Sequence, residues 1–255
     1  MKQSDTQQRR NAIVDWVNQH GTVQVETLAH HFGTSEVTIR KDLSLLANAQ
    51  RLIRQFGGAA PLPGTPSVPT ADKGKAYLGA AAAAVIGQRR KLVIDCGSTT
   101  QTLLPHLAAL DNLMVMSNSL HVANVLTNNP NEPTFLMTGG TWDPHSDSFQ
   151  GAMAENTVAA YSFDIAFIGA SGIDVGRGTT TLNELTGLTR TMAASAKDVV
   201  VMAESKKLDE RMPNLELAWS QITMLVTDDG ITAKDKQRIE AQGVTVRVAS
   251  RKGEN

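Results

Sequence analysis

The sequence predicts a small helical domain followed by a larger α/β domain with a mostly parallel sheet. Three observations lead to this fold class. Residues 1–60 carry apolar side chains at helical spacing, residues 61–75 contain four prolines and two glycines, and short apolar runs then alternate with helical segments. We therefore expect one domain at residues 1–60, an extended linker at residues 61–75 and a second domain at residues 76–255.

The first domain is expected to begin with two short helices. Ile13, Trp16 and Val17 share one face of the first helix. The second helix is indicated by apolar residues at i, i+3, i+4 and i+7, namely Val25, Leu28, Ala29 and Phe32. Gly33 then breaks the helical pattern.

A third helix is predicted from Ser35, its N-cap, to about Ala47. Its inner face consists of Ile39, Leu43 and Leu46, and its outer face of Val37, Arg40, Lys41 and Ser44. The following stretch "RLIRQFGG" alternates apolar and basic residues and ends in two glycines, as a hairpin or wing does. Helix, short turn and a cationic second helix form the helix-turn-helix pattern.

The cations of this domain are grouped where DNA would be contacted. The whole chain has a net charge of −1, so a nucleic-acid site must be local. An amphipathic helix with a charged outer face can be merely solvated, but three helices, a wing and neighbouring arginines together favour DNA recognition. We predict DNA contacts from the N-cap, the third helix and the wing: Ser35, Glu36, Val37, Thr38, Arg40, Lys41, Arg51 and Arg54.

The second domain contains seven short β-branched or apolar runs separated by helical segments. They are "KLVID", "LMVMSN", "TFLMTGG", "FDIAFIGA", "DVVVMA", "ITMLVTD" and "VTVRVA". Helical segments are expected near residues 101–109, 119–127 and 184–196. This alternation predicts a mostly parallel sheet that helices cover on both faces.

Small polar residues follow five of these strands, where ligands bind in open α/β sheets. In "DCGSTT", Gly97 lets the backbone approach a ligand, and the next three residues offer hydroxyl and N–H groups to an anion. One such loop is more often an ordinary turn, but five at strand ends favour a binding site.

The predicted ligand is a phosphorylated sugar or polyol. Lys207, Arg190 and Arg177 offer positive charge to a phosphate, while acidic residues could accept hydrogen bonds from hydroxyls. The predicted effector residues are Asp95, Gly97, Ser98, Thr99, Thr100, Asn118, Ser119, Gly139, Gly140, Gly169, Ser171, Gly172, Asp174, Glu184 and Lys207.

Other functional classes find little support in the sequence. Neither the Walker A spacing nor the dinucleotide fingerprint is present, so ATP and NAD are disfavoured and no cofactor is expected. The histidines lack metal-ligand spacing, so no metal site is predicted. Cys96 is the only cysteine and is better explained as a small, partly buried thiol than as a nucleophile. The absence of an apolar leader or spanning segment predicts a cytoplasmic protein.

In order along the chain, these segments resemble the DeoR family of bacterial transcriptional regulators. The resemblance rests on "VQVETLAHHF", "SEVTIRKDL", "RLIRQFGGA", "DCGSTT", "SNSL", "MTGG", "GASGID", "TTTLNE" and "AESKK". It implies a winged helix-turn-helix domain followed by a sugar-phosphate-sensing domain similar in fold to ribose-5-phosphate isomerase. "DCGSTT", "SNSLHVANVL" and "GAMAEN" look closest to the glucitol (sorbitol) operon repressor branch.

Two segments depart from the family pattern. A basic residue commonly follows "GGT", but here the run is Trp142, Asp143, Pro144 and His145. The usual "SSKF" is "SKKL", which places the family lysine at Lys207 beside an extra Lys206. Both departures lie in the expected effector pocket, so the effector can differ from that of close relatives.

The predicted function is a DNA-binding repressor of a carbohydrate-utilisation operon, released by a phosphorylated sugar or hexitol such as glucitol 6-phosphate. One small domain makes few contacts, so a homodimer or homotetramer on repeated half-sites of double-stranded DNA is expected. An activator remains an alternative, because the sign of regulation depends on the position of the operator.

A sugar-phosphate isomerase with an attached DNA-binding domain is the alternative from another class. Asp174, Glu184 and Lys207 could act as acid, base and electrostatic stabiliser. Isomerases of the related fold carry a second acid just before the residue that corresponds to Asp174, and residues 171–173 provide none. We therefore predict no catalytic residues and no enzymatic activity.

Overall fold

The computed structural model describes residues 2–21, 23–55, 57–62, 75–144, 146–182, 186–208 and 210–250. The chain forms two compact units, Met1–Asp72 and Lys73–Asn255. Residues 63–74 of the predicted linker lie outside the described residues, so the boundaries at residues 60 and 76 stay a prediction. Within the described ranges, no helix has both the length and the apolar character needed to cross a membrane.

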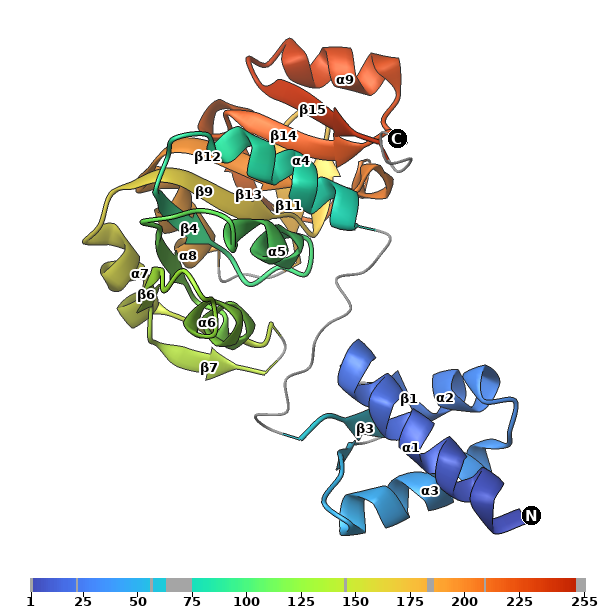
Figure 1. The fold of residues 1–255 in the computed structure, drawn as a ribbon. Coiled ribbons are helices and arrows are strands. Elements are labelled where there is room, and N and C mark those ends of the chain that lie inside the picture. The colour runs from blue at the N-terminus through green and yellow to red at the C-terminus, as the bar shows by residue number, and fades with distance from the viewer. Residues whose placement is uncertain are drawn as a thin grey trace. The chain divides into compact units, whose positions relative to one another are not determined.

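The first unit contains three helices and a small antiparallel sheet (Figure 1). Its elements are α1 (Lys2–His20), β1 (Val23–Gln24), α2 (Val25–His31), α3 (Glu36–Asn48), β2 (Ile53–Gln55) and β3 (Gly58–Ala60). The strand order is β1-β3-β2, and β2 and β3 form the predicted wing. The helix-turn-helix with a wing is therefore confirmed.

The helical spacing of the sequence accounts for the core of this unit. Ile13, Leu28, Ile39 and Leu43 are completely buried, one or two from each helix. Ser35 caps α3 as predicted, since its Oγ accepts a hydrogen bond from the Thr38 N–H at 3.3 Å. The second and third helices thus pack as the sequence predicts, with the outer face of α3 left open.

A buried acid ties α1 to α3. Asp42 is 2% exposed. It accepts hydrogen bonds from the Nε atoms of Arg9 and Arg10, each at 2.8 Å. These two arginines therefore hold α3 in place and are not part of its exposed face.

The second unit is built on a seven-stranded parallel sheet of order β15-β14-β12-β9-β4-β5-β6. The strands are β4 (Lys91–Ile94), β5 (Met114–Ser117), β6 (Thr134–Met137), β9 (Phe163–Gly169), β12 (Ala196–Met202), β14 (Met224–Asp228) and β15 (Thr245–Ala249). They coincide with the seven predicted runs. The chain first builds outward from β4 to β6 and then returns to the other side of β4, so the order reverses between β4 and β9.

Helices cover both faces of the sheet, as predicted. On one face lie α4 (Ala76–Ile86), η1 (Thr100–Leu103), α5 (Leu104–Leu107) and α6 (Leu120–Thr127), packed on Ile165 and Phe167 of β9 (Figure 1). On the other lie α7 (Ala152–Ala159), α8 (Gly187–Ala194) and α9 (Ala233–Glu240), which share a core with Ala166 and Ile168. Alternate residues of β9 thus face opposite layers.

Two further strand groups were not predicted. A small antiparallel sheet has the order β10-β11-β13 and consists of β10 (Gly172–Asp174), β11 (Gly178–Thr181) and β13 (Asn214–Ala218). A hairpin consists of β7 (Thr141–Asp143) and β8 (Ser148–Gln150). Two short 3₁₀ helices, η2 (Ser205–Lys207) and η3 (Trp219–Gln221), complete the elements.

Candidate functional site

The exposed face of α3 presents the residues expected to contact DNA. Val37 is 73% exposed, and Arg40 and Lys41 are exposed as well. Ser35 and Thr38 lie at the N-terminus of the helix, where their hydroxyl groups are 2.9 Å apart. An apolar side chain so open to solvent at the start of a helix suits contact with a partner surface.

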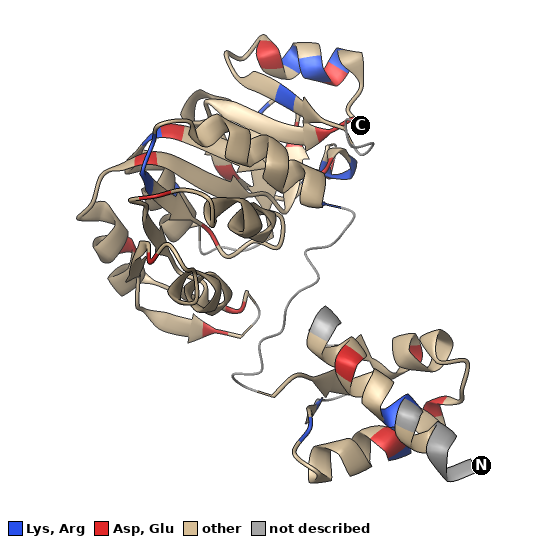
Figure 2. Ribbon diagram, viewed as in Figure 1, with Lys and Arg blue, Asp and Glu red and all other residues tan. Residues whose placement is uncertain are grey.

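The cationic side chains of the first unit differ in the ion pairs and hydrogen bonds that they form. Figure 2 shows Lys and Arg on α1, α3 and β2. Arg40 forms an exposed ion pair with Glu36 at 2.7 Å, and such pairs contribute only about 0–1 kcal/mol. Arg54 of β2 donates a hydrogen bond to the Ser44 Oγ at 2.6 Å, so the wing arginine reaches the outer side of α3.

Arg51 is positioned differently from the other predicted DNA contacts. Its Nη1 donates a hydrogen bond to the Asn11 Oδ1 of α1 at 2.7 Å. It is half-buried, whereas Arg40, Lys41 and Arg54 are exposed. The structure therefore brings three of the four predicted cations to an open surface and places the fourth against α1.

A cavity of about 240 Å³ lies at the carboxyl ends of β4 and β9, where the strand order reverses. We call it the strand-end cavity. Ligands bind at such switch points in open α/β sheets. Its lining consists of Asp95, Cys96, Gly97, Ser98, Thr99, Asn118, Ser146, Gln150, Gly169, Ala170, Ser171, Thr181, Leu188, Thr189, Met192, Lys207 and Glu216.

The predicted effector residues divide into those that line this cavity and those that do not. The lining includes Asp95, Gly97, Ser98, Thr99, Asn118, Gly169, Ser171 and Lys207. The lining does not include Thr100, Ser119, Gly139, Gly140, Gly172 and Asp174. Glu184 lies outside the described residues. The strand-end rule thus located the cavity but did not separate its lining from nearby turns.

Asp95 holds the two central strand ends together. Its Oδ1 accepts hydrogen bonds from the Gly97 N–H at 2.6 Å and the Thr100 hydroxyl at 2.9 Å, and its Oδ2 accepts one from the Gly169 N–H at 2.7 Å. Desolvation by burial raises the pKa of the Asp95 carboxyl, against the lowering effect of these bonds. Asp95 therefore shapes the loop, and the Thr100 hydroxyl is turned toward it.

Other predicted residues serve local structure in the same way. The Ser119 Oγ caps α6 by accepting a hydrogen bond from the Val122 N–H at 3.4 Å. Asp174 accepts one from the Gly176 N–H at 2.8 Å and lies 3.7 Å from the Arg211 guanidinium. Asp174, the acid assigned to the alternative isomerase function, therefore does not line the cavity with Lys207.

Lys207 supplies the positive charge of the strand-end cavity. Its Nζ donates a hydrogen bond to the carbonyl oxygen of Ala170, just beyond β9. Burial lowers the pKa of Lys207, and the charge of Lys75 lowers it further. Lys206, the extra lysine of the sequence, is exposed, pairs with Glu204 at 3.1 Å and does not line the cavity.

The predicted phosphate neutralisers Arg190 and Arg177 have other positions. Arg190 donates hydrogen bonds to the carbonyl oxygens of Glu216 at 3.0 Å and Leu215 at 2.7 Å. Neither arginine lines the strand-end cavity. Among the described residues that do line it, Lys207 is the one Lys or Arg.

Two side chains of the wall have unusual surroundings. Burial raises the pKa of the Cys96 thiol to about 11, which keeps it protonated at neutral pH and unsuited to nucleophilic attack. The Asn118 Nδ2 donates to the Phe149 carbonyl oxygen at 3.2 Å, whereas its buried Oδ1 has no hydrogen-bond partner within the described chain.

Glu216 is the lining residue that is hardest to predict from the sequence. It stands between Leu215 and Leu217, an alternation that favours an outward-facing acid. In the structure, burial and then the charge of Asp95 raise the pKa of its carboxyl to about 7. The cavity therefore holds one cationic and two acidic side chains.

The sequence departure after "GGT" falls in the β7–β8 hairpin. Trp142 packs edge-on against Phe149 with their ring centroids 5.3 Å apart. Asp143 accepts a hydrogen bond from the Ser146 hydroxyl at 2.5 Å, and Ser146 lines the cavity. His145 lies outside the described residues. A serine held by an acid thus contributes to the wall from this hairpin.

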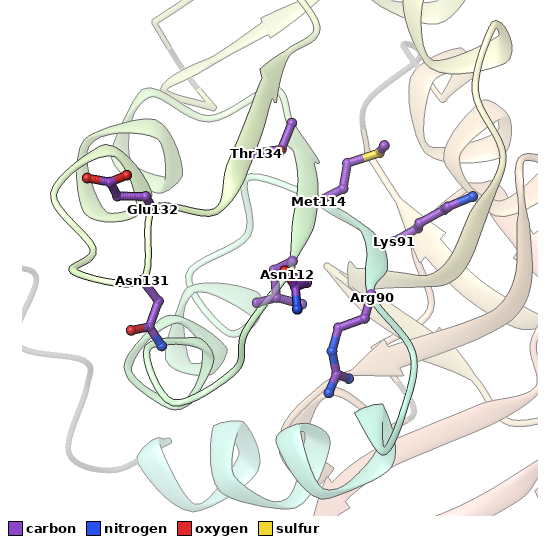
Figure 3. A pocket seen from close by; sticks show the side chains of 8 residues that line it. Arg90, Lys91, Asn112, Met114, Asn131, Glu132 and Thr134 are labelled. Carbon is purple, nitrogen blue, oxygen red and sulfur yellow. The ribbon is translucent and has the colours of Figure 1, made fainter.

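A second hollow of about 400 Å³ lies at the amino ends of β4, β5 and β6, at the other edge of the sheet (Figure 3). Lys91, Asn112, Asn131, Glu132 and Thr134 of its lining are exposed. The Arg90 guanidinium is occupied with the carbonyl oxygens of Gly87 and Arg89. Despite its larger volume, this hollow lacks the enclosed polar groups of the strand-end cavity.

Both units match known domain families. Residues 9–62 match the DeoR-like helix-turn-helix domain, and residues 70–229 match the DeoR C terminal sensor domain. The chain belongs to the DeoR family. DeoR-family relatives match it over nearly the whole length, so it is a transcriptional regulator of this family and the resemblance inferred from its motifs is confirmed.

Three relatives of this DeoR-family protein illustrate the range of sequence identity and coverage. The putative aga operon transcriptional repressor of Escherichia coli O157:H7 is 32% identical and covers 94% of this chain and 93% of its own. The HTH-type transcriptional regulator GlpR of Haloferax volcanii is 29% identical, over 94% and 96%. The glycerol-3-phosphate regulon repressor of Escherichia coli K12 is 31% identical, over 68% and 70%.

Solved structures show more distant likenesses. Ribose 5-phosphate isomerase A of Methanocaldococcus jannaschii aligns with a TM-score of 0.37 at 15% identity, over 55% of each chain. The eIF2B beta of Chaetomium thermophilum aligns with a TM-score of 0.44 at 12% identity, over 64% of this chain and 51% of that chain. These likenesses concern the fold alone.

Proposed function

We propose that this protein is a repressor of a carbohydrate-utilisation operon that a phosphorylated sugar or hexitol releases from DNA. The observation that carries the proposal is the presence, in one DeoR-family chain, of an open cationic recognition helix and a strand-end cavity with a lysine and an anion-competent loop. Glucitol 6-phosphate is the first compound to test, because several motifs resemble the glucitol operon repressor branch.

The proposed DNA contacts come from α3 and the wing. Arg40, Lys41 and Arg54 have exposed cationic groups, and Val37 has an exposed apolar side chain. Base edges in the major groove are read by such side chains, while phosphates fix the register. We further propose a homodimer or homotetramer, since a single winged unit spans only one half-site.

The proposed effector contacts come from the loop after β4 and from η2. Ser98 and Thr99 offer hydroxyl and N–H groups to a phosphate, and Lys207 offers a cation. Release of DNA requires that the effector bind the non-operator state more tightly than the operator-bound state. The effector and operator affinities must then be coupled reciprocally.

Fluorescence anisotropy with the full chain tests both parts. We expect specific binding to DNA from upstream of its own gene, release by one sugar or hexitol phosphate, and a steep loss of affinity with rising salt. Binding no stronger than to random DNA, or a flat salt response, would contradict the DNA-binding role.

Substitutions at the two sites should separate their effects. Arg40→Ala and Lys41→Ala should each weaken operator binding by roughly ten- to 150-fold, the range of one charge-assisted contact, and leave effector affinity unchanged. Ser98→Ala with Thr99→Ala should leave DNA binding intact and weaken release. Loss of both activities in either variant would indicate misfolding, which circular dichroism would reveal.

A further inference from the structure

One wall of the strand-end cavity carries an acid that the proposed phosphate site does not need. Glu216 lies on β13 of the small antiparallel sheet, and its side chain lines the same cavity as Lys207 and the loop after β4. A carboxylate repels a phosphate, so an acid in this position requires a different partner.

The backbone around Glu216 departs from regular strand pairing. Thr179 of β11 pairs with Leu217, and Thr180 pairs with Leu215, so Glu216 is an extra residue in a β-bulge. The carbonyl groups of Leu215 and Glu216 accept hydrogen bonds from Arg190 of α8. Bulges redirect a side chain and are frequent beside binding sites. This one turns an acid of a leucine-flanked strand into the cavity.

The carboxyl group is only partly satisfied by its neighbours. The Thr179 hydroxyl donates a long hydrogen bond of 3.4 Å to its Oε2, and the Thr189 side chain of α8 is a second hydrogen-bond partner. Two carboxylate oxygens can accept about four hydrogen bonds, so acceptor capacity is left toward the cavity.

Charged and titratable groups face Glu216 from several elements. Asp95 and Cys96 lie on the loop after β4, Lys207 on η2 and Arg190 on α8. Of these, Asp95 already accepts three hydrogen bonds from its own loop and from Gly169. The free acceptors of the cavity are therefore concentrated away from that acid.

We propose that Glu216 is a specificity-determining residue that accepts hydrogen bonds from the effector's hydroxyl groups while Lys207 and the loop after β4 bind its phosphate. The inference rests on the proposed function, because it assigns the two ends of one ligand. It defines the ligand class as a polyhydroxy monophosphate with a neutral distal end. A second anionic group at that end is rejected by like charge, which is specificity by repulsion.

Two matched probes test this assignment. Glucitol 6-phosphate and 6-phosphogluconate have the same carbon chain and phosphate, and they differ in a terminal hydroxymethyl against a carboxylate. Inorganic phosphate serves as the anion without a polyol. Isothermal titration calorimetry of the full chain at pH 8 gives the affinity for each probe, in wild type, Glu216→Gln and a control.

Glu210→Gln is the matched control. Glu210 is exposed and its charge acts on Lys207, yet it does not line the cavity. The Glu210→Gln substitution therefore removes one nearby negative charge without changing a residue that lines the cavity. Glu216→Gln preserves side-chain shape and removes a poorly solvated charge, so it should fold, and retained phosphate binding would verify this.

We expect wild type to bind glucitol 6-phosphate at least tenfold more tightly than 6-phosphogluconate. Glu216→Gln should reduce that ratio about tenfold, and Glu210→Gln should leave it within about twofold. An unchanged ratio in Glu216→Gln, an equal reduction in Glu210→Gln, or a wild-type preference for 6-phosphogluconate would each overturn the inference.

Release of operator DNA by the same probes keeps the two proposals distinguishable. If glucitol 6-phosphate binds and releases DNA but the ratio does not depend on Glu216, the inference alone fails. If neither polyol phosphate binds wild type or releases DNA, the effector class of the proposed function fails, and the role of Glu216 fails with it.

Discussion

Replacing Glu216 with glutamine should stabilise the second unit, and the gain should grow with pH. The pKa of the Glu216 carboxyl is raised from 4.5 to about 7 by burial and by Asp95. Between these two values the folded protein binds more protons at this site than the unfolded chain does. The free energy of unfolding therefore falls as pH rises through this window, and the loss is complete above pH 7.

The size of the effect follows from the pKa change. At about 1.4 kcal/mol per pH unit, a rise from 4.5 to about 7 corresponds to about 3 kcal/mol. The cavity is open to water on one side, which weakens the penalty, so we expect about 2 kcal/mol. Glu216→Gln removes this contribution, and the variant should equal wild type near pH 4.5 and exceed it by that amount at pH 8.5.

Urea unfolding at pH 4.5, 6, 7 and 8.5 measures this difference. A Trp16→Phe background leaves Trp142 and Trp219 as fluorescence reporters, both in the second unit. Glu240→Gln, on the exposed side of α9, is the control for loss of a surface charge. A stability gap between wild type and Glu216→Gln that stays constant with pH, or shrinks as pH rises, would refute the reasoning.

Two substitutions test the internal packing, one in each unit. Asp42→Asn removes the buried partner of two α1 arginines that are themselves about a quarter exposed, so it should cost the first unit about 2–3 kcal/mol. Hydrogen exchange in α1 and α3 should become roughly 30- to 150-fold faster, and an equal change in Asp15→Asn, on exposed α1 surface, would contradict this. Gly79→Ala should lower the unfolding temperature of the second unit, because a Cβ there would clash with the Thr102 carbonyl oxygen. Helix propensity alone predicts the opposite sign, about 1 kcal/mol of stabilisation, so a calorimetric increase would disprove the clash.

The elements that could be predicted are those whose side-chain period reports burial. Ile39, Leu43 and Leu46 recur at helical spacing, and they form the buried face of α3. The seven parallel strands are short apolar runs because both of their faces are covered, as on β9. Local periodicity was thus sufficient to predict most of the architecture.

The small antiparallel sheet could not be predicted in this way. The strand β11 is "GTTT", whose threonines are all buried and show no alternation of polar and apolar residues. Their burial depends on hydrogen bonds to distant segments, such as the one that the Thr180 hydroxyl donates to the Glu210 carbonyl oxygen at 3.2 Å. Pairings over such sequence distances leave no local pattern.

The residues of the candidate site likewise include some that the sequence could predict and some that it could not. Gly97, Ser98 and Lys207 follow strands whose ends meet at the switch point, so the strand-end rule could find them. The same rule also selected Thr100 and Ser119, because a hydroxyl that holds a loop or caps a helix has the same sequence context as one that binds a ligand. Contact partners, which only the fold provides, separate the two uses.

Glu216 is the opposite case: it lines the cavity, although the local sequence pattern predicts a solvent-exposed side chain. Its pattern between two leucines predicts an outward side chain, and the bulge in β13 reverses that direction. The reversal costs stability at neutral pH, since it brings a carboxyl beside Asp95 in a partly closed space. Where local preference and the fold disagree at a cost in stability, a functional contact is the expected compensation. At Glu216 this functional contact would be made by a hydrogen-bond donor of a ligand in the strand-end cavity. A polyol phosphate carries such donors at the end away from its charge.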